Sequence, residues 1–203
     1  MSQPDDATPH SIERLRDDAR AVLDKFLPED LRHFVDLVPD GPASREIAPS
    51  HLPVLKWLDD LAAGASFRTR PVVEGVIALA PRMAWGQTYD KAEVPDGFLE
   101  RYGWSEIVGP RGPIACQGFA MGVLMFGPSV NYPNHAHDAE EVYLPLSGTS
   151  LWQRDNADFA PLRPGAVIHH PPQMPHAMRT LSGPMLALYL WRGNDLSEKS
   201  TFR

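Results

Sequence analysis

The sequence predicts a mainly β protein, in which short antiparallel strands form a sandwich or closed barrel of the jelly-roll kind behind an N-terminal helical region. Three observations support this fold class. From residue 70 onward, short apolar segments recur at intervals of about 8 to 12 residues, separated by proline and glycine. The 203 residues include 21 prolines, which suit strand edges and turns better than long helices. Before residue 65, by contrast, apolar residues recur at helical spacing.

The N-terminal region is predicted to contain three helices after a polar, proline-bearing and therefore frayed stretch of about ten residues. The first helix has Ser11 as its N-cap and Pro28 as its stop. Its apolar stripe consists of Leu15, Ala19, Val22, Leu23 and Phe26. A second helix is expected from Glu29 to Leu37, and a third from Ser50 to Gly64. We expect residues 1–69 to cover an open face of a sheet, although the apolar stripe could instead form a dimer contact.

From Arg70 the pattern becomes that of a sheet, so the β-barrel is predicted to span residues 70–203 within a single structural domain. Residues 72–79 are rich in β-branched side chains and predict its first strand. The aromatic-rich segment 81–113 is predicted to be a long connection with a short helix at 97–102, serving either as a lid or as a plug of the barrel end. Further strands are predicted at 114–127, within 131–148, and at 149–154 and 184–192.

Charge and composition restrict the possible partners. The net charge is −7 and is spread along the chain, which disfavours nucleic-acid binding. Neither a leader-like start nor an apolar run long enough to cross a bilayer is seen, so we expect a cytoplasmic protein with no membrane partner, either a monomer or a homodimer. Cys116 is the only cysteine, and we interpret it as a small buried apolar residue.

One stretch combines groups that can bind a metal ion. His135, His137, Glu141 and Tyr143 all occupy odd positions, so an extended chain would place their side chains on one face. Imidazole, carboxylate and phenol oxygen together make a mixed nitrogen and oxygen cation site. This face is therefore predicted to line a metal centre inside the barrel.

Two motifs in this region resemble those of the cupin family. Gly127, followed by His135-x-His137-x₃-Glu141-x₆-Gly148, is similar to the first cupin motif, with seven residues rather than the usual five between Gly127 and His135. A second motif is similar in its Pro164-Gly165, Pro171 and His176, although Thr180 stands where an asparagine is usual. The resemblance implies a cupin barrel in which His176 is a further ligand and His135 is either a ligand or a residue just behind the ligands.

The tyrosine that follows the glutamate narrows the resemblance further. His-x-His-x-Ala-Glu-Glu-x-Tyr-x-Pro, with Tyr132 before it and Trp191 near the end, resembles the cupin-type lyases of dimethylsulfoniopropionate (DMSP), particularly the Q-type members of roughly 200 residues. The resemblance covers most of the chain from Arg70 onward. It implies β-elimination of DMSP to dimethyl sulfide and acrylate at one divalent transition metal, with zinc, iron or manganese favoured.

The residue types themselves support this elimination chemistry, without reference to the family resemblance. The proton beside the substrate carboxylate is weakly acidic, and a nearby cation stabilises the negative charge that develops when it leaves. Tyr143 is the predicted general base, because a cation lowers a phenol pKa from its usual value of about 10, and Tyr132 is the alternative base or a substrate-positioning group. Trp191 and Tyr189 are predicted to contact the sulfonium through their aromatic faces.

Other interpretations stay open at this stage. The same ligands would serve a cupin dioxygenase or isomerase, or a cupin that binds a small ligand without catalysis. The remaining histidines are predicted to bind no metal: His10, His33 and His51 as surface residues, and His169 and His170 as strand residues with solvated rings. Glu140 is predicted to be exposed or to orient a neighbour rather than to bind metal.

Overall fold

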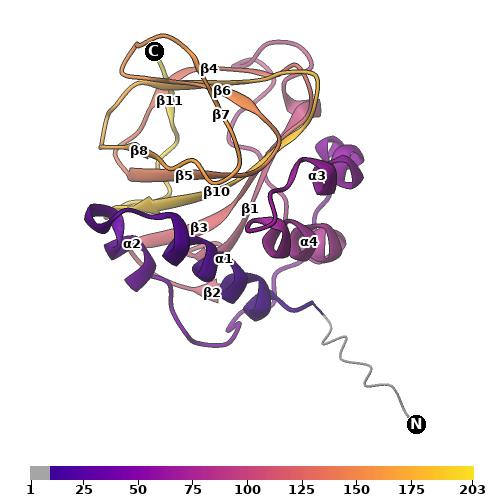
Figure 1. The fold of residues 1–203 in the computed structure, drawn as a ribbon, viewed down its shortest axis with the longest axis vertical. Helices are drawn as coiled ribbons and strands as arrows, with labels where there is room; N and C mark the ends of the chain where they lie inside the picture. Colours follow the sequence, from indigo (N-terminus) through magenta and orange to yellow (C-terminus); the bar gives the residue numbers. More distant parts are fainter. Residues whose placement is uncertain (1–9) are drawn as a thin grey trace.

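The structure is a computed structural model and describes residues 10–203. The frayed terminus predicted for the first ten or so residues falls almost entirely outside this range. A group of helices lies against one side of a β-barrel (Figure 1). The α-helices are α1 (Ile12–Phe26), α2 (His33–Asp36), α3 (Leu58–Gly64) and α4 (Arg70–Leu79). The 3₁₀ turns are η1 (Glu29–Leu31), η2 (Pro53–Trp57), η3 (Ala80–Arg82) and η4 (Leu99–Arg101).

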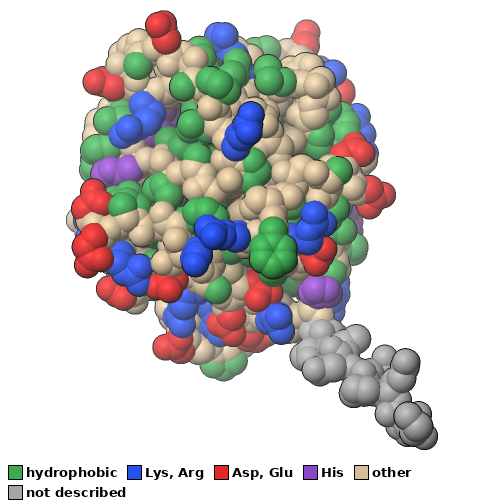
Figure 2. Space-filling view, viewed as in Figure 1, with side chains coloured by type: hydrophobic (Ala, Val, Ile, Leu, Met, Phe, Trp, Pro, Cys, Tyr) green, Lys and Arg blue, Asp and Glu red, His purple; other side chains and the backbone are tan. Residues whose placement is uncertain are grey.

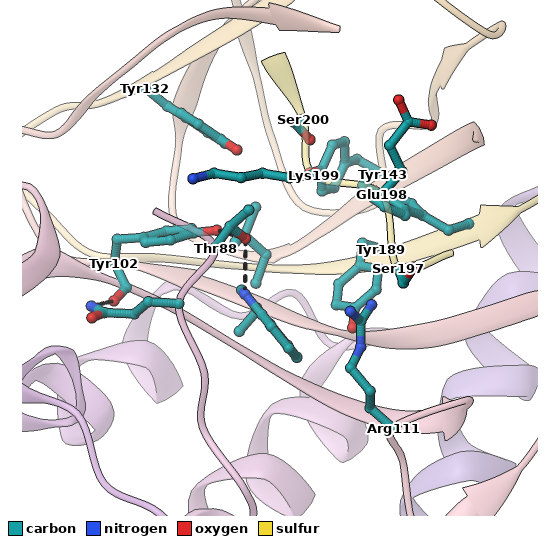
Figure 3. A pocket seen from close by; sticks show the side chains of 14 residues that line it. Thr88, Tyr102, Arg111, Tyr132, Tyr143, Tyr189, Ser197, Glu198, Lys199 and Ser200 are labelled. Atoms are coloured by element: carbon teal, nitrogen blue, oxygen red, sulfur yellow. Dashed lines mark hydrogen bonds between the residues drawn. The ribbon is translucent and has the colours of Figure 1, made fainter. Parts of the chain in front are cut away.

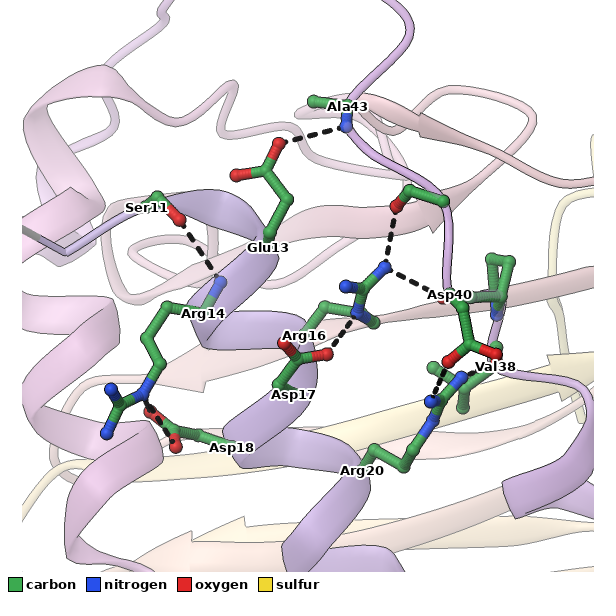
Figure 4. Close-up of polar contacts among 12 residues, drawn as sticks. Ser11, Glu13, Arg14, Arg16, Asp17, Asp18, Arg20, Val38, Asp40 and Ala43 are labelled. Carbon is green, nitrogen blue, oxygen red and sulfur yellow. Dashed lines mark hydrogen bonds and ion pairs between the residues drawn. The ribbon is translucent and has the colours of Figure 1, made fainter.

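Helix α1 confirms the first helical prediction and is tied to the chain that follows it. Ser11 caps the helix by accepting a hydrogen bond from the backbone N–H of Arg14 at 3.2 Å. The Glu13 carboxylate accepts a hydrogen bond from the backbone N–H of Ala43 at 2.9 Å. The buried guanidinium of Arg16 donates to two backbone carbonyl oxygens of the same returning segment, at 2.8 and 2.7 Å (Figure 4). These contacts hold the segment after α2 along the outer side of α1.

The strand predicted at residues 72–79 is wrong, because this segment is helix α4. Pro71 lies in the first turn, where its fixed φ angle fits a helix and its missing N–H leaves no hydrogen bond unmade. Glu74 and Ala78, one helical turn apart, are exposed, while Val72, Val73 and Val76 of the same helix are buried. The helical region therefore continues past the expected boundary between residues 69 and 70, and the proposed division of the chain at that point stays a prediction.

Two sheets face each other and enclose the barrel interior (Figure 1), which confirms the mainly β cupin fold with an N-terminal helical region. The six-stranded sheet has the order β2-β1-β3-β10-β5-β8 and the five-stranded sheet the order β11-β4-β9-β6-β7. The first six strands are β1 (Tyr102–Gly109), β2 (Ile114–Ala115), β3 (Phe119–Phe126), β4 (Asn131–Ala136), β5 (Glu140–Ser147) and β6 (Ser150–Arg154). The others are β7 (Ala160–Leu162), β8 (Ile168–His170), β9 (His176–Thr180), β10 (Met185–Arg192) and β11 (Thr201–Phe202).

The segment predicted as one long connection, residues 81–113, is partly a strand. Its second half is β1, which pairs with β3 along its length, and the short helix expected at 97–102 is the 3₁₀ turn η4. The predictive signal was weak because Gly103 and Glu106 interrupt the apolar pattern of β1. Glu106 is nevertheless buried, and its carboxylate accepts hydrogen bonds from the backbone N–H groups of Arg111 and Gly112 at 2.5 and 2.7 Å.

The six-stranded sheet is buried on both faces. On β5 and β10, the even-numbered leucines pack outward against the helices, as the alternation in the last strand predicts. On the opposite face, Tyr143 of β5 and Met185, Ala187 and Tyr189 of β10 point into the barrel and belong to a second, aromatic cluster. The buried side of α1 packs against α4 and the sheet, so the helical region covers an open sheet face as expected. This arrangement leaves Glu141 and Tyr143 of β5 facing the barrel interior.

The surface carries both signs of charge. On the face drawn in Figure 2, Lys and Arg side chains alternate with Asp and Glu, in agreement with the dispersed charge of the sequence. Among the described helices, none is both long and apolar enough to cross a membrane.

Candidate active site

Both sheets contribute histidines to the barrel interior. His135 lies on β4 and is directly paired with His176 on β9, while His137 follows the end of β4. Glu141 and Tyr143 come from β5 in the opposite sheet. All five side chains are buried, and Glu141 is completely inaccessible to solvent. The predicted inward direction of these odd-numbered residues is confirmed, but the reason differs from the one expected: the stretch is not a single strand, and its two halves face each other from opposite sheets across the break at residues 137–139.

Three of these residues could hold a metal ion. One donor atom each from His137, Glu141 and His176 lies within 4.8 Å of the other two. The Nε2 atom of His137 is 3.1 Å from Glu141 Oε2, and that of His176 is 3.2 Å from the same oxygen. The His176 Nε2 atom is buried and has no hydrogen-bond partner among the described residues. An unpartnered imidazole nitrogen beside a buried carboxylate fits a divalent cation with nitrogen and oxygen ligands.

Backbone carbonyls set the orientation of the histidine rings. The Nδ1–H of His137 donates to Ala139 O, and that of His176 donates to Met174 O, both at 2.9 Å. This arrangement assigns a proton to Nδ1 and directs each Nε2 toward Glu141, so that a ring whose Nε2 is deprotonated has the form that binds a metal. Each carbonyl lies only two residues away in sequence, so the local backbone fixes each ring.

Glu141 and the histidines around it shift one another's pKa values. Burial alone would raise the pKa of Glu141, but the surrounding histidines, His137 first, hold it well below its usual value. Burial tends to lower the pKa of His137, and the Glu141 carboxylate overcomes this and raises it. A bound cation requires a negatively charged partner, and a buried carboxylate that stays ionised provides one.

His135 lies beside this group rather than within it. Its ring stacks on Tyr132 at 4.1 Å between centroids and is 4.0 Å from the ring of His176, but 6.3 Å from that of His137. Its Nδ1–H donates to Pro133 O at 2.9 Å. Burial lowers the pKa of His135 well below its usual value, so the ring is neutral.

A cavity of about 220 Å³ opens beside the histidines. Its lining combines aromatic and polar side chains, with Tyr102, Tyr132, Tyr143 and Tyr189 around it and the polar segment Ser197–Ser200 across it (Figure 3). Trp191, another lining residue, donates its indole N–H to Glu141 Oε1, and its ring lies 4.5 Å from that of His137. Through Trp191 the cavity comes next to His137 and Glu141, although neither of them lines it, and its volume is below the range of about 300 to 1,000 Å³ that is usual for drug-sized ligands.

The cavity tyrosines differ in their partners. The hydroxyl of Tyr132 hydrogen-bonds to that of Tyr89 at 2.7 Å, and Tyr89 stacks on Phe202 of β11 at 4.6 Å. Burial first, and then the Glu141 carboxylate, raise the pKa of Tyr143 well above its usual value when no cation is present. Tyr143 is thus the cavity tyrosine whose acidity depends most directly on the candidate metal group.

Comparisons with known proteins agree with this geometry. The sequence model of the DMSP lyase (dimethylsulfoniopropionate lyase) family matches residues 31–187, more than half of the chain. The chain is also 31% identical over 169 residues to dimethylsulfoniopropionate lyase DddQ of Ruegeria pomeroyi, an alignment that covers 81% of each protein. The chain belongs to the DMSP lyase family. Members of this family are carbon–sulfur lyases, and this protein is therefore an enzyme of that class.

Other DMSP lyases support the same placement. A putative DMSP lyase DddL of Cereibacter sphaeroides is 32% identical over 162 residues, which cover 78% of this chain and 67% of the relative. The crystal structure of DddQ from Ruegeria pomeroyi superposes with a TM-score of 0.83 at 27% identity, over 94% of this chain and 95% of that one. A solved structure reported with the DMSP lyases RdDddP and RnDddQII gives a TM-score of 0.79 at 34% identity, over 95% and 97%. The helical region, for which the sequence resemblance was limited to length and position, is thus shared as well.

In this member of the DMSP lyase family, the predicted solvent exposure of one histidine is wrong. His170, predicted to be a solvated strand residue, is completely buried, with its Nδ1 atom 3.1 Å from Glu141 Oε2. Its neighbour His169 is half-buried and lies 3.0 Å from Glu140, as an orienting rather than ligating pair. The pairing of His170 with Glu141 depends on strand register, which the sequence motif did not reveal.

The other secondary predictions largely hold. His10 and His51 are exposed, and His33 is half-exposed near Glu140. Cys116, predicted to be buried, packs against the core but is only half-buried, so that prediction is right only in part. Thr180, which replaces the usual asparagine, donates to Gly127 O at 2.7 Å and accepts from the Val130 N–H at 2.8 Å. The threonine hydroxyl therefore joins the ends of the two motifs.

Proposed function

We propose that this enzyme cleaves DMSP by β-elimination to dimethyl sulfide and acrylate, with one divalent transition metal bound by His137, Glu141 and His176. The observation that carries the proposal is the buried His137–Glu141–His176 group beside an aromatic cavity in a DMSP lyase family member. Tyr143 is a further candidate ligand through its phenol oxygen. His135 packs its ring against that of His176 and in this way helps to hold that ligand in place.

The donor set restricts the metal without selecting one. Two imidazole nitrogens and a carboxylate oxygen suit zinc, iron or manganese. When bound, the cation would polarise the substrate carboxylate and stabilise the charge that develops on it. The carboxylate of Glu141 would supply the negative charge, and the Nε2 atoms of His137 and His176, in their deprotonated form, would supply the lone pairs for this binding.

Tyr143 acts as the general base in this proposal. Its phenolate removes the proton from the carbon beside the substrate carboxylate, and the electrons of that bond form the new carbon–carbon double bond. The bond between Cβ and sulfur breaks, and its electron pair leaves with dimethyl sulfide, so the sulfonium cation becomes neutral. Tyr143 then returns its proton to solvent. Because Tyr143 is hard to ionise on its own, catalysis should depend on the cation beside it.

The aromatic walls suit the other end of the substrate. A sulfonium is a permanent cation, and each aromatic face contributes on the order of 0.5 to 2 kcal/mol to its binding. Tyr189, Trp191 and Tyr132 line the cavity and are the proposed contacts. Trp191 is held through its indole N–H, which leaves its ring face fixed next to His137.

The direct test is to incubate the purified chain with DMSP and measure dimethyl sulfide in the headspace and acrylate in solution. We expect both products in equal amounts, their loss on treatment with a chelator, and recovery when zinc, iron or manganese is added back. The variant His176→Ala should be inactive, whereas His51→Ala, at an exposed position, should match the native enzyme. A metal-replete native sample that releases no dimethyl sulfide would overturn the proposal.

A further inference from the structure

Three side chains from adjacent strands form a row across the six-stranded sheet. Trp191 on β10 and His170 on β8 are each directly opposite Glu141 on β5, the strand that lies between them. Directly opposed residues on neighbouring strands place their side chains on the same face of a sheet. The Glu141 carboxylate is therefore flanked on both sides by nitrogen donors, with the Trp191 indole on Oε1 and the His170 imidazole on Oε2.

His170 contacts a second candidate ligand as well. Its ring lies nearly parallel to that of His176, with 3.9 Å between centroids and 12° between planes. Its Nδ1 atom is 3.1 Å from Glu141 Oε2, and its side chain is completely buried. Because an ionised carboxylate can only accept hydrogen bonds, Nδ1 must carry the proton in this contact. One side chain thus touches two of the three groups that would hold the metal.

We propose that His170 is a positioning residue that holds Glu141 and His176 in their metal-binding geometry. This inference rests on the proposed function, in which these two residues bind the cation. The Nδ1–H bond restricts rotation of the carboxylate, and the stacked ring prevents His176 from tilting toward β8. Removing such a partner of a ligand commonly costs 10- to 100-fold in metal affinity.

The adjacent residue provides a matched control. His169 is on the same strand but on the opposite face, where it is half-buried and pairs with Glu140 at 3.0 Å. Substitution of either histidine by leucine removes an imidazole from β8 and leaves a branched side chain suited to a strand position. Only the change at residue 170 removes a contact with the proposed ligands.

The test measures metal binding apart from turnover. Chelator-treated native protein and the variants His170→Leu, His170→Asn and His169→Leu are titrated with zinc against a chromophoric competitor, and their cobalt-substituted forms are compared by visible absorption. We expect His170→Leu to bind zinc 10- to 100-fold more weakly with an altered cobalt spectrum, and His169→Leu to stay within about twofold of native. His170→Asn should recover most of the affinity, because its side-chain amide can donate from near the position of Nδ1. An affinity and a cobalt spectrum unchanged in His170→Leu would overturn the proposal.

A second comparison keeps the test decisive if His170→Leu does not fold. Asparagine presents an N–H near the position of Nδ1, whereas glutamine presents one near that of Nε2, so His170→Asn should bind zinc several-fold more tightly than His170→Gln. Equal affinities of these two variants would contradict the proposed hydrogen bond. Native protein that binds neither zinc nor cobalt would overturn the proposed function together with this inference. Native protein that binds metal and releases dimethyl sulfide, with no dependence on residue 170, would overturn this inference alone.

Discussion

Glu141 and Tyr143 occupy the same face of β5, two residues apart, and their environments give them opposite tendencies. The histidines around Glu141 favour its ionised form and hold its pKa well below the usual value. Tyr143 is buried next to that negative charge, so its pKa is raised and it stays protonated until a cation is added. Pairs of titratable groups whose environments separate their pKa values in this way are typical of acid–base catalysis.

Substitution of the proposed base tests this assignment. We expect Tyr143→Phe to lower kcat by about 10²- to 10⁴-fold, because it removes proton abstraction while keeping the aromatic ring in the cavity. Metal content, measured on the purified variant, should fall far less than activity. Tyr132→Phe is the matched comparison, since it also removes one cavity hydroxyl, here the one bonded to Tyr89. If Tyr143→Phe keeps near-native turnover and Tyr132→Phe does not, Tyr132 is the base.

The buried histidines predict how the metal-free protein responds to acid. Burial lowers the pKa of His170 from 6.5 to about 4, so the folded state resists a proton that the unfolded chain accepts. His170 therefore stabilises the fold above about pH 6.5, and this contribution is lost as pH falls toward 4, up to on the order of 3 kcal/mol. His135 acts in the same direction, whereas His137, with its raised pKa, acts in the opposite one.

Comparison with a variant isolates this effect from the other titrating groups. Urea unfolding of chelator-treated native protein and His170→Asn should be followed at pH 7, 6, 5 and 4. The unfolding free energy of the native protein should fall more steeply with decreasing pH than that of the variant, which has no titrating group at this position. Parallel pH dependences would show that His170 is not the buried neutral histidine described here.

At the level of elements, α4 shows why residues 72–79 were predicted to form a strand. A run of valines and isoleucine has high strand propensity, yet tertiary packing decides between strand and helix in short apolar segments. The helical signals were Pro71 in the first turn and the exposed pair Glu74 and Ala78 at a spacing of four. The buried hydroxyl of Thr69 donates to Leu146 O at 2.6 Å, which fixes the start of α4 against the end of β5.

The contact between α4 and α1 depends on a glycine. A Cβ atom built on Gly75 would be 3.0 Å from Leu15 Cδ1, closer than ordinary van der Waals contact. Gly75→Val should therefore lower the free energy of unfolding by about 1 to 3 kcal/mol through overpacking, despite the better helix propensity of valine. Ala78→Val, on the exposed side of the same helix, should change stability by less than about 0.5 kcal/mol. Urea unfolding of both variants measures the difference, and equal stabilities would contradict close helix packing at this point.

The candidate site was predictable where alternation within a strand suffices. The shared inward direction of Glu141 and Tyr143 follows from their spacing of two on β5, and the cupin motifs indicated His137 and His176, although the turn between β4 and β5 was not foreseen. The partners of Glu141 were harder to predict. His170 and Trp191 lie opposite Glu141 because of the registers in which β8 and β10 pair with β5, and a single sequence does not specify these registers. For the same reason, the hydrogen bond between Trp191 and Glu141 was not predicted, although the residue itself was placed in the cavity.

At the scale of the whole molecule, the helices and the outer face of the six-stranded sheet share one continuous core. That core joins Leu15 and Leu23 of α1 to Val76 of α4 and to the outward leucines of β5 and β10. The aromatic interior of the barrel is a second cluster on the other face of the same strands. The sheet that carries Glu141 is therefore held between two apolar layers, and only one of them belongs to the barrel.

This arrangement predicts that the barrel does not fold without the helices. A fragment of residues 70–203 keeps every candidate ligand and α4, but it exposes outward leucines of β5 and β10, since α1, α2 and α3 are missing. We expect the fragment to aggregate or to bind a hydrophobic dye, to lack a cooperative urea transition, and to bind zinc at least 100-fold more weakly than the whole chain. The whole chain should unfold in one transition, with far-ultraviolet circular dichroism and tryptophan fluorescence coinciding. A fragment that unfolds cooperatively and binds zinc as tightly as the whole chain would instead show that residues 70–203 are an independent domain.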